Sequence, residues 1–147
     1  MKKSLLLLSL CLIHFQFLSA QVYQQWDYSH SGPLNHSDNG QDIITDNDNN
    51  VIAVGIEDDE DAFVGKWTNS GTLLWTATHN GSANSTDAFY AVAIDNENNI
   101  YAAGISHEAT SSWDIVTNKY NADGVLQWSK LKNGSSNIEE NATDIAV

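Results

Sequence analysis

Short runs of β-branched and aromatic residues alternate with turn-forming residues along the chain after residue 20. Apolar residues do not recur at helical spacing over three turns in this region, so strands are expected rather than helices. In the first repeated unit, strands are expected over 43–45, 51–55, 62–67 and 72–78. The Asp- and Asn-rich segment 46–50 and the segment 68–71, with its counterpart 121–124, are typical of hairpin turns. Gly71 and Gly124 at the ends of the last two supply a left-handed backbone position.

This pattern of strands and turns repeats along the chain. Residues 43–55 align without a gap with 92–104, and 61–75 align with 114–128. The difference in length between the two units lies in one loop, which is typical of a surface connection. The alignment places the units at about 41–89 and 90–142, with a third unit that begins at 144.

A Trp-x5-Gly signature marks the same repeat, because it begins at Trp26, Trp75 and Trp128. Self-similarity at about 50 residues indicates propeller blades or solenoid units. The predicted fold is all-β and antiparallel, with four-stranded β-propeller blades, two complete and two partial, that do not form a closed ring. Propellers typically contain 4 to 8 blades, so the chain is expected to be a fragment or truncated product that needs further blades in cis or in trans.

The first 20 residues are expected to be a signal peptide. Lys2 and Lys3 form its charged start, 5–18 its apolar run, and cleavage after Ala20 would expose Gln21. The protein is therefore expected to be secreted or displayed at the cell surface. An acylated Cys11 is the alternative, although the large residue before this cysteine disfavours lipoprotein processing.

Acidic residues dominate the charge of the chain, which has a formal net charge of −13 and no arginine. This sign disfavours nucleic-acid binding and attraction to anionic lipid. The apolar run in the leader is also too short for a comfortable membrane span. Solubility outside the cell is the simplest interpretation of the acidic balance, and a surface that collects cations is the alternative.

The ordered Asp, Gly, Lys-aromatic, Gly and Trp positions in 91–104 and 114–128 resemble the seven-bladed β-propeller (SBBP) repeat of bacteria. The resemblance covers nearly all of 26–147. It implies a secreted or cell-surface protein of didermal bacteria, a group in which such proteins often end in a sorting or anchoring domain. No catalytic residues accompany this family, so the resemblance implies none here.

Two turns contain alternating oxygen ligands, which are a weak signal for calcium: Asp46 and Asp48 in the first unit, and Asp95 and Glu97 in the second. An EF-hand loop also needs a glycine at its sixth position and a distal bidentate glutamate, and both are missing. Plain hairpin turns are the favoured interpretation, and no cofactor is predicted. The five acidic residues of 57–61 are expected to form a solvated, variable loop.

The repeated aromatic and histidine positions have structural interpretations. Trp26, Trp75 and Trp128 are expected to pack between blades, and a sugar-stacking platform is the alternative. His30 and His79 share one position of the Trp-x5-Gly signature, and this position is expected to be exposed.

Two classes of function are compatible with these features. The favoured one is a non-enzymatic structural or interaction module whose blade loops bind a protein or glycan outside the cell. The alternative is the scaffold part of a larger extracellular enzyme whose site lies at the channel of a complete propeller. No catalytic residue is predicted within this chain.

Overall fold

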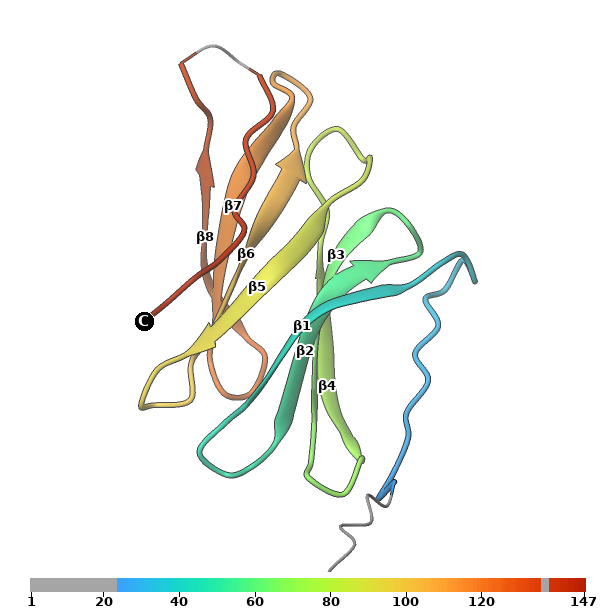
Figure 1. Ribbon diagram of the computed structural model, residues 1–147. Coiled ribbons are helices and arrows are strands. Elements are labelled where there is room, and N and C mark those ends of the chain that lie inside the picture. Colours follow the sequence, from blue (N-terminus) through green and yellow to red (C-terminus); the bar gives the residue numbers. More distant parts are fainter. Residues whose placement is uncertain (1–23, 136–137) are drawn as a thin grey trace, which may run out of the picture.

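The computed structural model describes residues 24–135 and 138–147, and all regular secondary structure in this part of the chain is β (Figure 1). The expected leader 1–20, with Cys11, lies outside the described residues. The strands form two antiparallel four-stranded sheets, each with its strands in chain order. The first sheet contains β1 (Asn39–Thr45), β2 (Val51–Glu57), β3 (Asp61–Trp67) and β4 (Leu73–His79), and the second contains β5 (Ala88–Ile94), β6 (Ile100–His107), β7 (Trp113–Tyr120) and β8 (Leu126–Lys132).

The all-β prediction and the four strands per unit are confirmed, and the strand bounds differ mainly at β1. This strand begins at Asn39 rather than at residue 43. Its first residues are polar, but their backbone pairs with the end of β2 across a bulge between Gly40 and Asp42. Backbone pairing of a polar segment leaves no mark in the hydrophobic pattern, which explains the missed residues.

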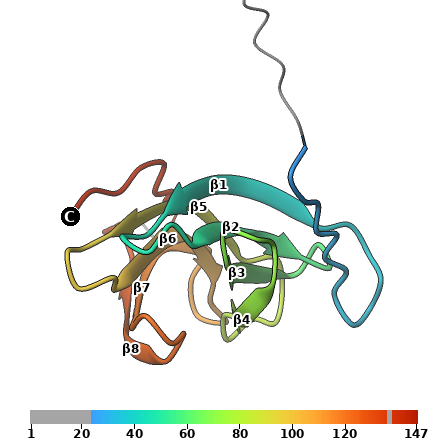
Figure 2. The ribbon, with the colours of Figure 1, turned by 90° about the horizontal axis from the view of Figure 1, so that it is seen from below.

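The two sheets pack side by side, and they do not form a closed ring. In Figure 2, β1 and β5 lie on one side of the molecule and β4 and β8 on the opposite side. The β1–β2, β3–β4, β5–β6 and β7–β8 turns gather at one end of the sheets, here called the turn end. The β2–β3, β4–β5 and β6–β7 connections gather at the other, here called the loop end (Figure 1).

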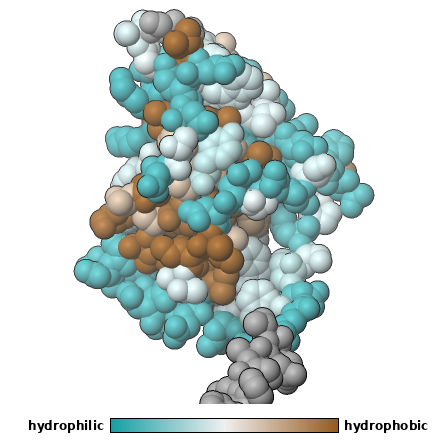
Figure 3. Space-filling model, in the orientation of Figure 1, coloured by the Kyte–Doolittle hydropathy of each residue, from teal (hydrophilic) through white to brown (hydrophobic). Residues whose placement is uncertain are grey.

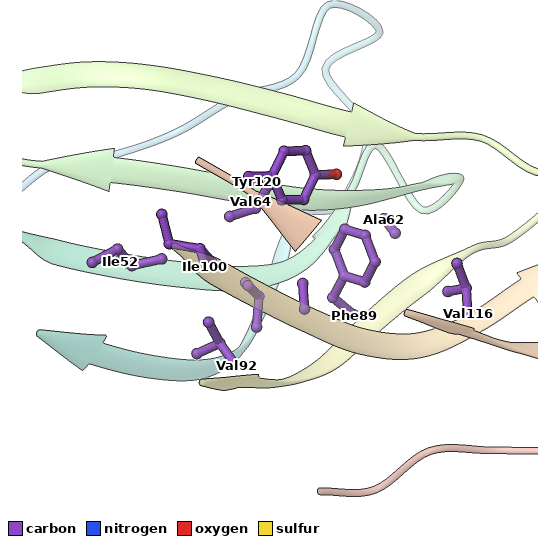
Figure 4. Close-up of a cluster of buried hydrophobic side chains, with 10 residues drawn as sticks. Ile52, Ala62, Val64, Phe89, Val92, Ile100, Val116 and Tyr120 are labelled. Carbon is purple, nitrogen blue, oxygen red and sulfur yellow. The ribbon is translucent and has the colours of Figure 1, made fainter. Parts of the chain in front are cut away.

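A hydrophobic cluster joins the sheets, since β5 packs against β1, β2 and β3. Figure 4 shows side chains of both sheets in this cluster, with the aromatic rings of Phe89 and Tyr120 among aliphatic neighbours. Burial of apolar area stabilises such an interface by about 25 cal/mol per Å². The first sheet contributes Ile52, Val54, Ala62 and Val64, and the second contributes Phe89, Val92, Ile100, Ala102, Val116 and Tyr120.

Aligned residues differ in exposure because only one face of each sheet meets the other sheet. Val92 in β5 is 6% exposed, whereas its counterpart Ile43 in β1 is 66% exposed. An apolar area is visible in Figure 3 where β1, β5 and the C-terminal segment lie. Each sheet therefore has one face packed against its neighbour and one face that no other four-stranded sheet covers within the described residues.

Among the described residues, no helix is long and apolar enough to cross a membrane.

Candidate functional site

Two signature tryptophans lie on hairpin turns of the unit that follows them. The Trp75 Nε1–H in the first sheet donates to the carbonyl oxygen of Ala122 in the β7–β8 turn, at 3.1 Å. The Trp26 Nε1–H, which precedes the first sheet, donates to the carbonyl oxygen of Asn69 in the β3–β4 turn, at 2.9 Å. Asn69 and Ala122 occupy the same turn position. We call this arrangement the tryptophan–turn contact. The expected packing of Trp75 between units is confirmed.

A glycine at the end of each turn makes the tryptophan–turn contact possible. Gly71 and Gly124 have φ values of 86° and 81°, a left-handed conformation that L side chains rarely adopt, as the sequence predicts. A Cβ atom at Gly71 would lie 2.8 Å from the Trp26 ring, and one at Gly124 would lie 2.5 Å from the Trp75 ring. Each glycine therefore closes its turn and also leaves room for an indole.

Lys66 adds a second donor to the contact between the sheets. Its Nζ donates to the carbonyl oxygen of Ala122 at 3.1 Å, the same acceptor that Trp75 uses. The ammonium also pairs with Asp46 Oδ2 at 2.9 Å, and both side chains are almost completely buried. A buried ion pair needs further hydrogen bonds to offset its desolvation, and the Asp46 carboxylate receives them from the backbone N–H groups of Asp48 and Asn50.

The calcium candidates lie in two equivalent turns at the turn end. Asp95 Oδ1 accepts hydrogen bonds from the backbone N–H groups of Glu97 and Asn99, just as Asp46 Oδ1 does in the first sheet. Asp48 and Glu97 are exposed. Among the described residues, no group of three or more acidic, histidine or cysteine side chains is placed to bind a metal ion. The positive φ values of Asn49 and Asn98 match the predicted hairpin geometry.

Hydrogen bonds determine the acidity of the Asp95 carboxyl. Partial burial raises its pKa, but donors from Asn99, Tyr101 and the backbone outweigh this effect and lower the pKa to about 2. A carboxyl group whose pKa is lower in the folded state stabilises that state above its unfolded pKa. This contribution is lost as the pH falls from about 4 towards the folded value of about 2.

Acid titration tests this role of Asp95. Wild-type protein is expected to lose thermal stability between about pH 4 and pH 2, and Asp95→Asn is expected to flatten this dependence while lowering the midpoint at pH 7. Melting curves followed by circular dichroism from pH 2 to 7 measure both effects. Glu97→Gln removes an exposed carboxyl from the same turn and serves as the control. An unchanged pH dependence in Asp95→Asn would contradict the role.

The acidic loop at 57–61 is not wholly solvated, contrary to the sequence-based expectation. Asp58 is buried, and its two carboxylate oxygens accept hydrogen bonds from the backbone N–H groups of Leu34 and His36, both at 2.9 Å. These bonds lower the pKa of Asp58 against the opposing effect of burial. Asp58 thus ties the segment before β1 to the β2–β3 loop, a contact between residues more than 20 positions apart that no local pattern reveals.

The two equivalent histidines are also half-buried rather than exposed as expected. His30 contacts the Phe63 ring, with 4.5 Å between ring centroids, and its imidazole is hydrogen-bonded to Glu57. His79 is hydrogen-bonded to Ser106 at 2.9 Å and lies near Phe89. Each histidine therefore bridges one unit to the next.

A cleft of about 370 Å³ opens at the loop end of the second sheet, and Tyr90, Trp113, Glu139 and Asn141 contribute to its lining. Tyr90 is the extra residue of a bulge in β5, and a bulge redirects a side chain. The Trp113 indole is fixed by a hydrogen bond from its Nε1–H to the Thr86 carbonyl oxygen. The cleft therefore combines two aromatic rings with carboxylate and amide groups, which the sequence did not reveal because the residues come from three separate segments.

A backbone hydrogen bond positions the far wall of the cleft. The Glu140 N–H donates to the Trp113 carbonyl oxygen at 2.8 Å. The equivalent bond one unit earlier joins the Asp87 N–H to the Glu60 carbonyl oxygen at 2.6 Å. Glu140 thus contacts the second sheet as Asp87, just before β5, contacts the first.

No known family model matches the chain, and the chain has no significant match among curated proteins.

Proposed function

We propose that this protein is a secreted or cell-surface β-propeller repeat segment that acts as a structural module and binds a glycan or protein outside the cell. The blade arrangement is supported by the repeated sheets, which lie side by side with equivalent strands on the same side of the molecule. The acidic composition and the leader pattern favour a role outside the cell.

The cleft at the loop end carries the binding part of this proposal. Its volume of about 370 Å³ lies within the usual range of small-ligand sites, which is about 300–1,000 Å³. Aromatic rings offer apolar faces to the C–H groups of a sugar, while carboxylate and amide groups bind its hydroxyls. Tyr90, Trp113, Glu139 and Asn141 supply both kinds of contact, which favours a glycan in the cleft.

A binding screen tests this function directly. The purified chain is incubated with an array of bacterial cell-surface polysaccharides and common oligosaccharides, and binding is expected to at least one of them. Glu139→Gln is expected to weaken that binding about tenfold or more, because a charged acceptor of a hydrogen bond contributes about 1.5–3 kcal/mol. Glu97→Gln is the matched control, since it removes an exposed carboxylate from the β5–β6 turn at the opposite end of the sheet. Absence of any glycan binding, or equal effects of the two substitutions, would contradict a glycan site in the cleft.

A further inference from the structure

The second sheet repeats the side chains that join the first sheet to it. Neighbouring strands of the first sheet pair Ile52 with Lys66 and Lys66 with Trp75, so these three residues form one row across the sheet. In the second sheet the aligned row is Tyr101, Lys119 and Trp128. The first row faces the second sheet, because Ile52 belongs to the cluster between the sheets and both Lys66 and Trp75 bond to Ala122.

The row in the second sheet lies on the face that points away from the first sheet. Ile100 and Tyr120 flank this row along β6 and β7 and are buried in the cluster between the sheets, and successive side chains of a strand alternate between faces. Trp128 is 37% exposed, and within the described residues its indole N–H has no hydrogen-bond partner. The Lys119 side chain is 22% exposed and lies 3.7 Å from Asp95, whereas Lys66 is 5% exposed and 2.9 Å from Asp46.

Among the described residues, the signature tryptophans outnumber the turns that can accept their indole N–H groups. Three signature tryptophans are described, but only two turns of the required kind are described with them. Trp26 occupies the turn that ends at Gly71, and Trp75 occupies the one that ends at Gly124. A second copy of this chain is therefore a poor match for Trp128, because both of its turns already carry its own tryptophans.

Residues 138–147 give further support for a continuing array. Within this segment, the Glu140–Trp113 backbone bond repeats the Asp87–Glu60 bond of the preceding unit. The N–H of Ile145 donates to Asp144 Oδ1 at 2.8 Å, as the N–H of Ile43 does to Asp42 Oδ1 in β1. Residues 144–147 therefore correspond to the first strand of a further unit, although they pair with no strand within the described residues, and a docking sheet would supply strands to pair with them.

We propose that Lys119 and Trp128 form a docking site for a further β-sheet of the same repeat. Both donors bind one backbone carbonyl oxygen in the turn between the third and fourth strands of that sheet, and a left-handed glycine two residues later accommodates the indole. The docked sheet pairs with 144–147 as β2 pairs with β1. The site rests on the proposed repeat architecture, but it lies at the turn end and does not depend on glycan binding in the cleft at the loop end.

An extended chain tests the docking site. The chain's own residues 95–132 are appended after Val147, because Val147 aligns with Ile94, and the appended part supplies three strands and a new Asn-Ala-Asp-Gly turn. Indole N–H exchange is followed by nuclear magnetic resonance, with the Trp128 signal assigned through Trp128→Phe. In the parent chain the Trp75 N–H is expected to be protected and that of Trp128 unprotected. In the extended chain, exchange at Trp128 is expected to slow about tenfold or more, equivalent to about 1.4 kcal/mol.

A matched control tests whether the slower exchange at Trp128 depends on the appended turn. The extended chain with Gly124→Val only in its appended copy has no room for the indole, so Trp128 is expected to exchange as fast as in the parent while Trp75 stays protected. Three results would overturn the proposal: appended strands that do not fold onto the parent, equal Trp128 exchange with and without the extension, or protection of Trp128 in the parent that increases with protein concentration. The last result would identify a second copy as the occupant.

Discussion

Phe89→Ala is expected to lower the free energy of unfolding by about 3–5 kcal/mol, a typical cost of truncating a buried phenylalanine. The Phe89 side chain is fully buried in the cluster that joins the two sheets (Figure 4), so the substitution leaves a cavity at the interface itself. A domain is usually stable by only about 5–15 kcal/mol. The loss is therefore expected to be a large fraction of the total stability of the protein.

Urea unfolding followed by tryptophan fluorescence and far-ultraviolet circular dichroism measures this effect. Leu126→Ala is the control, because Leu126 is 48% exposed in β8 and its truncation is expected to change stability by about 0.5 kcal/mol or less. A loss below about 1 kcal/mol for Phe89→Ala would show that the cluster contributes little, since a complete phenylalanine side chain would then be dispensable at the interface.

Gly104→Ala is expected to destabilise the second sheet by about 3 kcal/mol, the upper part of the usual range for overpacking. A Cβ atom at Gly104 would lie 1.9 Å from the carbonyl oxygen of Ala88, which is backbone and cannot turn aside. Gly104 pairs with Phe89 at the edge of the β5 bulge, so relief of this clash would displace β5 and with it the interface between the sheets. The same close approach occurs in the first sheet, where a Cβ at Gly55 would lie 2.0 Å from the Asn39 carbonyl oxygen.

Gly40→Ala provides the matched control for this substitution. Gly40 also lies beside a bulge, in the edge strand β1, but a Cβ atom there would have nothing within 4 Å. The change is expected to be neutral or slightly stabilising, because alanine restricts the unfolded chain more than glycine does. Thermal unfolding of both variants gives the comparison, and equal midpoints would refute the steric explanation.

The local elements were predictable because each depends on residues close together in sequence. Turn chemistry predicted the left-handed Gly71 and Gly124, and alternation with β-branched residues predicted eight strands in two repeated groups. The partner of each signature tryptophan was not predictable from the sequence pattern alone. Trp75 bonds to a residue 47 positions away, and only the packing of two sheets brings these groups together.

Buried carboxylates were not predicted from the sequence, for a different reason. Asp87 is buried and accepts hydrogen bonds from the backbone N–H groups of Gly81 and His107, at 2.8 and 2.7 Å. A sequence reading treats such an acid as a solvated surface group, as it does Asp58, because composition indicates exposure for charged residues. The sequence did contain one indication of these positions, because the acidic residues Asp38, Asp87 and Glu140 recur at the spacing of the repeated units. These residues lie in connections, however, and the repeat was traced through the strands.

The tryptophan–turn contact also has a consequence for how the length of this protein can change during evolution. Each contact joins a signature tryptophan to a turn of the unit that follows it, so the segment from one signature tryptophan to the next spans one repeat and contains the turn that receives the preceding indole. Duplication or loss of one such segment by recombination leaves every remaining internal tryptophan with an acceptor turn. Insertions at the loop end, where the two units differ in length, also leave these contacts intact. The gene can therefore gain or lose whole units without any compensating substitution at the junction.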